Sequence, residues 1–209
     1  MLKPPDMSET TDALACLPAV ATIGQRSLEE ALFSRRSIRH FARLPITLSA
    51  ISQLAWAATG ATAYGCRTIP SAGALYPLVV YVVAGNVEGL GAGVYRYHVA
   101  GHVLERTLSR DCRVSLCAAA LGQDFIREAP ASLVIAAAYT RTSEKYGSRG
   151  ARYVLMEAGH AGQNVYLQAA ALGLGTVAVG AFEDEQVQQV LRLSKETHPL
   201  YIMPAGSPI

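Results

Sequence analysis

The sequence predicts one domain built from a mixed sheet with helices on both of its faces. Runs rich in β-branched residues, which are typical of strands, alternate along the chain with segments whose apolar residues recur at helical spacing. The 209 residues show no internal repeat and no low-complexity segment, so they suit a single globular unit. Because 51% of the residues are hydrophobic and only 16% are charged, the chain can bury a large core.

The first half of the chain begins with two helices. Ser27 can cap the first, because Glu30 stands three residues later and completes the spacing of a capping box. Thr47 can cap the second, which stops near Gly60. A loop rich in Gly, Thr and Ser separates these helices from the first strands. The strands expected here lie at 79–84, 93–99 and 103–104.

The second half alternates helices with buried strands. A continuous apolar run at 132–139 is typical of a strand covered on both faces, and the polar segment 140–149 after it is expected to be a loop. A long helix follows and ends at Gly173, since glycine commonly terminates helices. The helices expected here lie at 111–121, 151–172 and 184–192, and the strands at 132–139, 176–180 and 200–203.

The charges of the chain argue against nucleic acid as a partner. The 18 basic residues oppose 16 acidic ones, a net charge of only +2, and outside 35–43 the basic residues are scattered. The apolar segment 153–172 is not expected to cross a membrane, because it contains Glu157, His160, Gln163 and Asn164. The low charge instead favours an oligomer that covers part of the apolar surface.

Residues 1–26 are expected to form an N-terminal extension, and 27–209 a single domain. The apolar stretch 14–23 follows acidic residues and is interrupted by Pro18, which is unlike a secretory signal peptide. We therefore expect a cytoplasmic protein. The four cysteines lack C-x-x-C spacing and a partnering histidine pattern, so buried thiols are expected rather than a zinc site or a redox dithiol.

Glu157 and His160 have the Glu-x-x-His spacing of carboxylate di-iron sites. Such a site needs a second unit of this kind and two further glutamates on neighbouring helices, which the sequence does not supply. No metal site is therefore expected, and the two side chains are interpreted as a hydrogen-bonded pair in the interior.

Three guanidinium groups and a hydroxyl stand within five residues, at Arg35, Arg36, Ser37 and Arg39. A guanidinium is a permanently charged, planar fork of donors, which suits a phosphate. Cations are also common where helices end, so the cluster alone would indicate a solvated helix end. In a cofactor site, Arg35 and Arg36 would bind phosphate, and Ser37 and Arg39 would bind ribityl or pyrimidine oxygens.

Two further segments favour such a cofactor site. The loop at 70–74 and the segment 179–181 offer backbone with few bulky side chains, against which a flat cofactor can lie closely. Both are flanked by runs typical of strands. Their residues are Pro70, Ser71, Ala72, Gly73 and Ala74, and Val179, Gly180 and Ala181.

Lys145 and Tyr146 lie in the polar segment that follows the buried strand. Spacing alone indicates a surface turn, because both residue types are common in loops and Gly147 suits a turn. The alternative is a catalytic pair. Neighbouring cations at Arg149 and Arg152, together with a flavin, would favour a neutral lysine that can act as a base. Tyr146 would then position or relay a proton.

Taken together, these segments resemble the nitroreductase-like flavoprotein superfamily, and within it the SagB-type dehydrogenases of thiazole- and oxazole-modified peptide pathways. The resemblance covers about residues 27–206 and depends on the order and spacing of its parts. These are Arg35-Arg36-Ser37-x-Arg39, Pro70-Ser71-Ala72-Gly73-Ala74-x-Tyr76-Pro77, Lys145-Tyr146-Gly147-x-Arg149, Arg152-Tyr153, Glu157-x-Gly159-His160-x-x-Gln163-Asn164 and Gly180-Ala181-Phe182.

The resemblance implies an α+β three-layer sandwich with a central mixed, mostly antiparallel sheet flanked by helices. It implies FMN bound by the segment 35–39, with 70–74 and 179–181 along the flavin, in a homodimer with two active sites at the subunit interface. In the azoline dehydrogenases a Lys-Tyr pair serves catalysis, and this pair maps onto Lys145 and Tyr146. A cyclodehydratase or scaffold protein would deliver the peptide substrate.

The implied activity is oxidation of peptide thiazolines or oxazolines to azoles. Lys145 would remove a ring proton while hydride passes to flavin N5. Two alternatives stay open: an NAD(P)H-dependent reductase of nitroaromatics or quinones, and a flavin-bearing, non-catalytic subunit of a peptide synthetase complex.

The sequence departs from the nitroreductase pattern at two places. Ala74 stands where typical nitroreductases have an amide side chain, which favours the peptide-modifying branch. The chain has Gly206-Ser207-Pro208 where they have basic residues near the FMN phosphate. The second departure leaves Arg35 and Arg36 to hold the phosphate.

Overall fold

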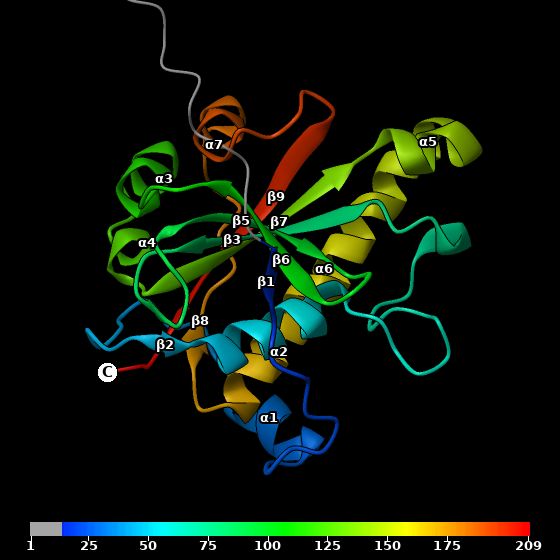
Figure 1. Cartoon of the computed structure of the whole chain (residues 1–209). Helices are drawn as coiled ribbons and strands as arrows, with labels where there is room; N and C mark the ends of the chain where they lie inside the picture. Colours follow the sequence, from blue (N-terminus) through cyan, green and yellow to red (C-terminus); the bar gives the residue numbers. More distant parts are fainter. Residues whose placement is uncertain (1–13) are drawn as a thin grey trace, which may run out of the picture.

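A computed structural model describes residues 14–209, and its centre is a seven-stranded sheet (Figure 1). The strand order is β1-β6-β5-β3-β7-β9-β8, and every neighbouring pair is antiparallel. The strands are β1 (Leu14–Cys16), β2 (Ile46–Thr47), β3 (Leu78–Ala84), β4 (Val87–Glu88), β5 (Gly93–His98), β6 (Val103–Leu108), β7 (Ala131–Ala138), β8 (Gly175–Thr176) and β9 (Thr197–Gly206). A short parallel pair, β2 with β4, lies outside this sheet.

Helices cover both faces of the sheet, so the fold is an α+β sandwich of three layers, as predicted (Figure 1). The helices are α1 (Leu28–Ser34), α2 (Leu48–Thr59), α3 (Arg113–Ala119), α4 (Phe125–Glu128), α5 (Thr140–Tyr146), α6 (Gly150–Ala171) and α7 (Asp184–Leu191), with short 3₁₀ turns η1 (Ala72–Ala74) and η2 (Gly147–Arg149).

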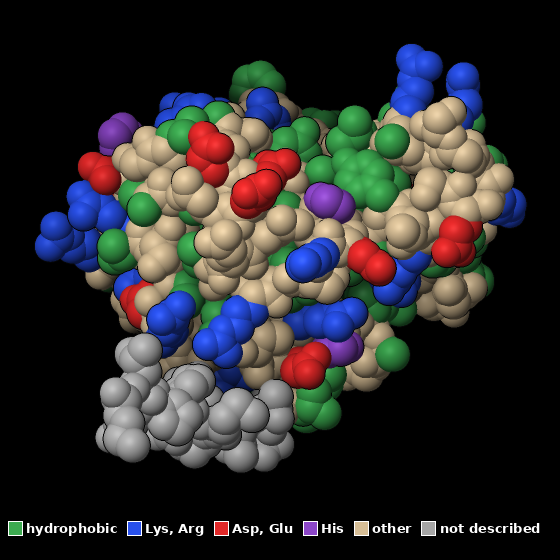
Figure 2. Space-filling view, turned by 90° about the horizontal axis from the view of Figure 1, so that it is seen from above, with side chains coloured by type: hydrophobic (Ala, Val, Ile, Leu, Met, Phe, Trp, Pro, Cys, Tyr) green, Lys and Arg blue, Asp and Glu red, His purple; other side chains and the backbone are tan. Residues whose placement is uncertain are grey.

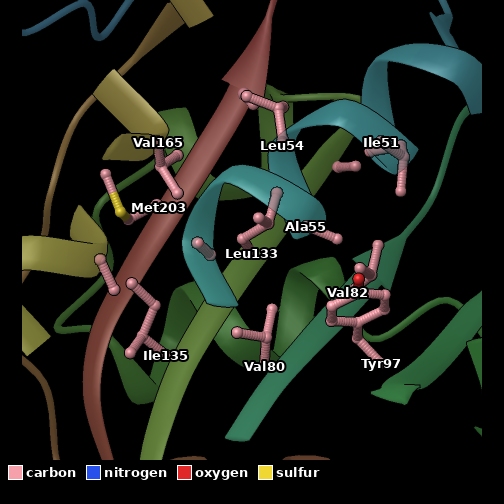
Figure 3. Packing of buried hydrophobic residues seen from close by; sticks show 14 of the residues in the cluster. Ile51, Leu54, Ala55, Val80, Val82, Tyr97, Leu133, Ile135, Val165 and Met203 are labelled. Atoms are coloured by element: carbon pink, nitrogen blue, oxygen red, sulfur yellow. The ribbon is translucent and has the colours of Figure 1, made fainter. Parts of the chain in front are cut away.

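The core forms two apolar clusters, one on each side of β3 and β7, whose side chains alternate between the faces. On one side, Leu54 of α2 and Val165 of α6 pack against Val80, Leu133 and Met203 of the sheet (Figure 3). On the other side, the helices α3, α4 and α7 cover the sheet. The covering residues there include Leu116, Ile126, Val187 and Leu191.

The predicted caps of the first two helices are confirmed. Ser27 Oγ accepts from the Glu30 N–H at 3.1 Å, and the Glu30 carboxylate accepts from the Ser27 N–H at 2.7 Å. Thr47 Oγ1 accepts from the Ala50 N–H at 3.1 Å, and α2 ends at Gly60. These side chains satisfy backbone donors that have no partner within the helix.

The expectation of a loop over 140–149 was wrong. Residues Thr140–Tyr146 form α5, η2 follows, and α6 begins at Gly150. The predicted strand at 176–180 is also shorter: β8 covers Gly175–Thr176, and Val179 makes only an isolated bridge with Ile202. The sequence of α5 has no apolar residues at helical spacing, so its periodicity did not indicate a helix. We infer that tertiary packing stabilises it.

The remaining surface predictions have mixed outcomes. Cys112 and Cys117 are buried as expected, whereas Cys16 and Cys66 are exposed. Figure 2 shows one face of the molecule, on which basic and acidic side chains are interspersed. No helix within residues 14–209 is both long enough and apolar enough to span a bilayer. The acidic residues that precede position 14 lie outside the described residues.

Candidate functional site

The predicted phosphate ligands Arg35 and Arg36 line a cavity of about 230 Å³ where the chain leaves α1. Tyr166 of α6 and Thr176 of β8 line it as well. The Arg35 guanidinium carbon lies 4.9 Å from the centre of the Tyr166 ring, a distance typical of a cation–π contact. The predicted ligand Arg39 lies elsewhere, 5.9 Å from the centre of the Phe125 ring.

A third guanidinium, that of Arg26, lines the same cavity. Its Nη1 donates to the backbone oxygen of Ala170 in the last turn of α6 at 2.8 Å, which holds the side chain there. Within residues 14–209, neither Arg26 nor Arg35 nor Arg36 forms a salt bridge. The buried hydroxyl of Thr176 has no hydrogen-bond partner in the same part of the chain.

Three unpaired cations and an unpaired hydroxyl suit a group with several negatively charged oxygens, such as a phosphate. The residues present therefore fit the phosphate of a nucleotide cofactor. Arg26 adds a third positive charge to the lining of this cavity. Sequence reasoning missed Arg26 because it assigned residues 1–26 to an extension.

Tyr166 connects the arginine cluster to the second predicted cofactor segment. Its hydroxyl oxygen lies 2.9 Å from Ser37 Oγ and accepts from the Ala178 N–H at 2.8 Å. Ser37 also forms a parallel bridge with Thr176. The structure thus brings the segment 35–37 next to 176–181, as a shared cofactor site requires. No pattern in the sequence singled out Tyr166.

The backbone of 179–181 is fixed, while its outer side is open. Val179 exchanges two hydrogen bonds with Ile202, at 2.9 and 3.0 Å. The carbonyl of Ala181 accepts from Gln123 Nε2 at 2.9 Å. Gly180 and Ala181 are both exposed. A rigid, exposed strip of backbone without large side chains is suited to lie against a flat ring.

The loop 70–74 makes a tight turn that contains η1. Gly73 and Ala74 have φ angles of 62° and 54°, both in the left-handed region. Ser71 Oγ accepts from the Tyr76 N–H at 2.9 Å and closes the turn. Pro70, Gly73 and Ala74 are exposed. The turn therefore presents its backbone to the surface in a fixed shape.

Lys145 and Tyr146 of α5 meet this loop at Gly73. A Cβ atom on Gly73 would lie 2.8 Å from Tyr146 Oη and 3.0 Å from Lys145 Nζ. The Tyr146 ring packs edge-on against Tyr153 of α6, with centroids 5.1 Å apart. Lys145 Nζ lies 5.5 Å from the centre of the Tyr146 ring. Two segments that the sequence singled out separately are thus in contact, and Lys145 remains exposed in the single chain.

Glu157 of α6 is buried close to the same loop. Glu157 is only 3% exposed, and its Oε1 atom has no hydrogen-bond partner among the described residues. Burial raises the pKa of Glu157, while the Ser71 hydroxyl and the positive charge of Arg67 oppose the rise. The expected interior pair with His160 is wrong, because His160 is exposed and no hydrogen bond joins the two.

The site residues form two groups, which we call the arginine half-site (Arg35, Arg36, Ser37 and 179–181) and the lysine half-site (Lys145, Tyr146 and 70–74). Within the chain they border different parts of α6. Tyr166 contacts the first and Glu157 the second, and these residues lie on opposite sides of the helix, about 13 Å apart along its axis. Figure 1 shows α1 and α5 at opposite ends of α6.

Comparisons with known proteins agree with this architecture. The family model described as "Nitroreductase family" matches residues 32–207. The Methanocaldococcus jannaschii protein provisionally named nitroreductase MJ1384 is 47% identical over 188 residues, which cover 90% of this chain and 94% of that protein. A crystal structure of a Ralstonia eutropha protein, also provisionally named a nitroreductase, has a TM-score of 0.83 and 31% identity, covering 96% of this chain and 91% of that one.

A second group of matches comes from peptide processing. The Escherichia coli microcin B17-processing protein McbC is 32% identical over 137 residues, which span 63% of this chain and half of McbC. A chain of the E. coli microcin synthetase McbBCD complex, with truncated pro-MccB17 bound, has a TM-score of 0.73 and 26% identity, covering 95% of this chain and 79% of that chain. The family model and the identity to MJ1384 show that this chain belongs to the nitroreductase family of oxidoreductases.

Proposed function

We propose that this protein is an FMN-dependent dehydrogenase that oxidises a thiazoline or oxazoline ring in a peptide to the aromatic azole. The observation that carries this proposal is the contact of Lys145 and Tyr146 with the loop at Gly73. A base and a hydroxyl are thereby placed beside the backbone that we expect to line the flavin. The peptide-processing relatives McbC and the McbBCD complex support a peptide substrate.

The arginine half-site would hold FMN, with Arg26, Arg35 and Arg36 around its phosphate and Ser37 near its ribityl or ring oxygens. Arg39 and the backbone of 179–181 are further expected contacts, as are the residues of the loop 70–74. Bound FMN would supply a hydride acceptor. The chain's own contribution is to hold the ring in place and to manage the proton that leaves the substrate.

Lys145 Nζ would accept that proton from the ring carbon of the azoline, and Tyr146 Oη would orient the substrate or pass the proton on. For this role Lys145 must be neutral, which requires that water be excluded around it. The single chain leaves Lys145 exposed. Cofactor, substrate or a second protein chain must therefore cover it.

A homodimer would provide such cover. The exposed face of α6 carries Leu155, Met156, Gly159, His160 and Gln163, and this face lies between the two half-sites. The cavity of about 230 Å³ at the arginine half-site is smaller than most sites for whole ligands, which span roughly 300–1,000 Å³. A second copy packed on α6 would border both half-sites and complete them. A cyclodehydratase or scaffold protein is a further expected partner.

A second candidate function is reduction of nitroaromatics or quinones by NAD(P)H. The 47% identity to the protein provisionally named nitroreductase MJ1384 favours it. The same fold and the same flavin site would serve both reactions. They differ in whether the flavin receives hydride from an azoline or from a nicotinamide.

The role of Lys145 is tested with the variant Lys145→Met in the FMN-loaded protein. We expect bound FMN to stay at the wild-type level and azole formation from a thiazoline peptide to be lost, because binding does not need the base. Tyr146→Phe should retain binding and lower the rate. Glu144→Met, an exposed neighbour on α5, is the control and should leave the rate unchanged. Azole formation by the Lys145 variant would contradict the assigned role.

A further inference from the structure

A second cavity, of about 440 Å³, lies at the end of the sheet where α5 begins. Its floor is formed by side chains of neighbouring strands, among them Tyr81 of β3 and Arg96 of β5, which are directly opposite each other in the ladder. Arg141 of α5 and Arg192 at the end of α7 also line the cavity. Figure 1 shows that α5 and the connection from α7 to β9 lie at the same end of the sheet.

The three arginines of this cavity lack acidic partners. Within residues 14–209, none of Arg96, Arg141 and Arg192 forms a salt bridge. Arg141 donates one hydrogen bond to the Tyr76 carbonyl at 3.1 Å, and its other donors stay free. Arg96 is half-buried on an inner strand, so leaving its charge without a partner is unfavourable. A half-buried, unpaired guanidinium in a cavity is therefore a position for a bound anion.

Two carboxylates also line the cavity, and they do not cancel its positive charge. Glu105 lies opposite Arg96 in the β5–β6 ladder, but it pairs with His98, at 2.6 Å between Nε2 and Oε2. Glu196 is exposed in the connection before β9. Because His98 cancels the charge of Glu105 only when it is protonated, the lining has three arginines against two carboxylates, an excess of one positive charge.

The cavity continues toward the lysine half-site. A smaller cavity of about 150 Å³ shares Arg96 and Arg141 with it and extends to Tyr76. Tyr76 belongs to the same turn as Gly73, whose Cα lies beside Lys145 Nζ. Arg141 and Lys145 are four residues apart on α5, so their side chains lie on one face of that helix. We call the two cavities together the arginine-lined groove; it lies beside α5, the helix that carries Lys145, although Lys145 lines neither cavity.

We propose that this arginine-lined groove binds a carboxylate of the peptide substrate, close in sequence to the ring that reacts at Lys145. The assignment rests on the proposed function for its substrate and adds the chemical class that the enzyme selects: peptides with an acidic residue near the azoline. About one turn of α5 separates Arg141 from Lys145, a distance of about 6 Å along the helix. The length of the arginine side chain adds to this distance. An extended peptide spans the total in about three residues.

The test uses the full-length, FMN-loaded protein and two fluorescein-labelled thiazoline peptides. The peptides are identical except for Asp or Asn at the second residue after the ring. Fluorescence anisotropy under anaerobic conditions measures binding, and mass spectrometry measures azole formation in air, where oxygen reoxidises the flavin between turnovers. We expect the Asp peptide to bind roughly tenfold more tightly, as the loss of one charge-assisted hydrogen bond would predict. Arg96→Gln and Arg141→Gln should each remove most of this preference by raising KM with little change in kcat.

Arg110→Gln is the matched control, because Arg110 is exposed and lines neither cavity. It should keep the preference for the Asp peptide. Arg141 is exposed, so its variant tests the groove even where Arg96→Gln lowers the thermal stability. Equal binding of the two peptides, or a preference that survives both substitutions, would overturn the assignment.

The outcomes separate this inference from the proposed function. Azole formation without a preference for the Asp peptide would support the dehydrogenase function and contradict carboxylate binding in the groove. The protein could instead prefer the Asp peptide through Arg96 and yet never form the azole. That result would support carboxylate binding in the groove and contradict the dehydrogenase function. Loss of NADPH binding in Arg96→Gln, with peptide binding unchanged, would assign the groove to a nucleotide phosphate and overturn the inference.

Discussion

Gly73 is the residue at which the loop 70–74 meets Lys145 and Tyr146, the pair that we propose to be catalytic. Its φ angle of 62° lies in the left-handed region, where a side chain costs about 1 kcal/mol. A Cβ added to Gly73 would lie 2.8 Å from Tyr146 Oη and 3.0 Å from Lys145 Nζ, so it would push the ends of these two flexible side chains away. Strain and close approach act together at this position.

For Gly73→Ala we expect a loss of about 1 kcal/mol in the free energy of unfolding and a larger loss in azole formation, because the methyl group displaces Lys145 and Tyr146. Urea unfolding and kcat measure the two effects. Gly122→Ala is a matched control, since Gly122 has a φ angle of 72° and no atom within 4 Å of the added Cβ. Should both variants lose the same activity, backbone strain alone would explain the result and the contact would have no catalytic meaning.

Glu157 links the stability of the protein to pH. Burial raises its pKa above the ordinary value of 4.5, so the folded state favours the neutral acid. The stability that Glu157 contributes is therefore fully present below pH 4.5 and is lost as the pH rises through the raised pKa. At higher pH the buried carboxylate has a charge without a close partner.

Glu157→Gln should remove this dependence, because the amide stays neutral. We expect the wild type to lose stability relative to the variant as the pH rises from about 4 to 8, and urea unfolding across that range measures the difference. Glu144→Gln on the surface should show no such trend relative to the wild type. A constant difference between wild type and Glu157→Gln would show that folding leaves the pKa of Glu157 unchanged.

At the scale of elements, the helices with local signals could be predicted and α5 could not. The helix α1 begins at the cap Ser27, and α2 begins at the cap Thr47 and ends at Gly60. Each of these signals involves only a few adjacent residues. The seven residues of α5 lack an apolar face and a side-chain cap. Its backbone instead approaches α6 so closely that a Cβ on Gly150 would lie 2.8 Å from the Cα of Ser143. Such a contact cannot be read from local sequence.

Tyr166 shows how one helix joins two distant segments. Its hydroxyl contacts both Ser37 and the Ala178 N–H, so Tyr166→Phe leaves these groups without their partner. We expect a loss of about 1–3 kcal/mol in unfolding free energy and weaker FMN binding, measured by urea unfolding and by quenching of flavin fluorescence. Tyr64→Phe is the control, because Tyr64 is 91% exposed. An unchanged affinity for FMN would mean that the arrangement of Ser37 and 176–181 does not matter for the cofactor.

At the scale of the whole molecule, the sequence offers candidate residues for the site, and only the fold shows how they are arranged. The arginine cluster, the two backbone segments and the Lys-Tyr pair were found by residue type and order. Their division into two half-sites on either side of the exposed face of α6 depends on helix phase and on long-range packing. Arg26 was missed for the same reason, since only the packing of the chain before α1 on the end of α6 brings it to the cavity.

This division leads to a prediction about assembly. If a second copy completes the site, the wild type is a dimer, and Met156→Glu on the exposed face of α6 should yield monomers with weakened FMN binding. Light scattering after gel filtration gives the mass, and flavin absorbance gives the occupancy. Val114→Glu places the same charge on α3, at another exposed apolar residue, and should remain dimeric. A monomeric wild type that binds FMN fully would contradict the composite site.

The central claim is that an azoline in a peptide, rather than a nicotinamide, reduces the flavin. The most direct test follows the visible absorption of the purified, FMN-loaded protein under anaerobic conditions after addition of a thiazoline peptide, and separately after addition of NADPH. We predict rapid bleaching of the flavin band with the peptide, together with formation of the azole, and a persistent band with NADPH. Rapid bleaching by NADPH and none by the peptide would contradict the account and assign the protein to the reductases of nitroaromatics or quinones.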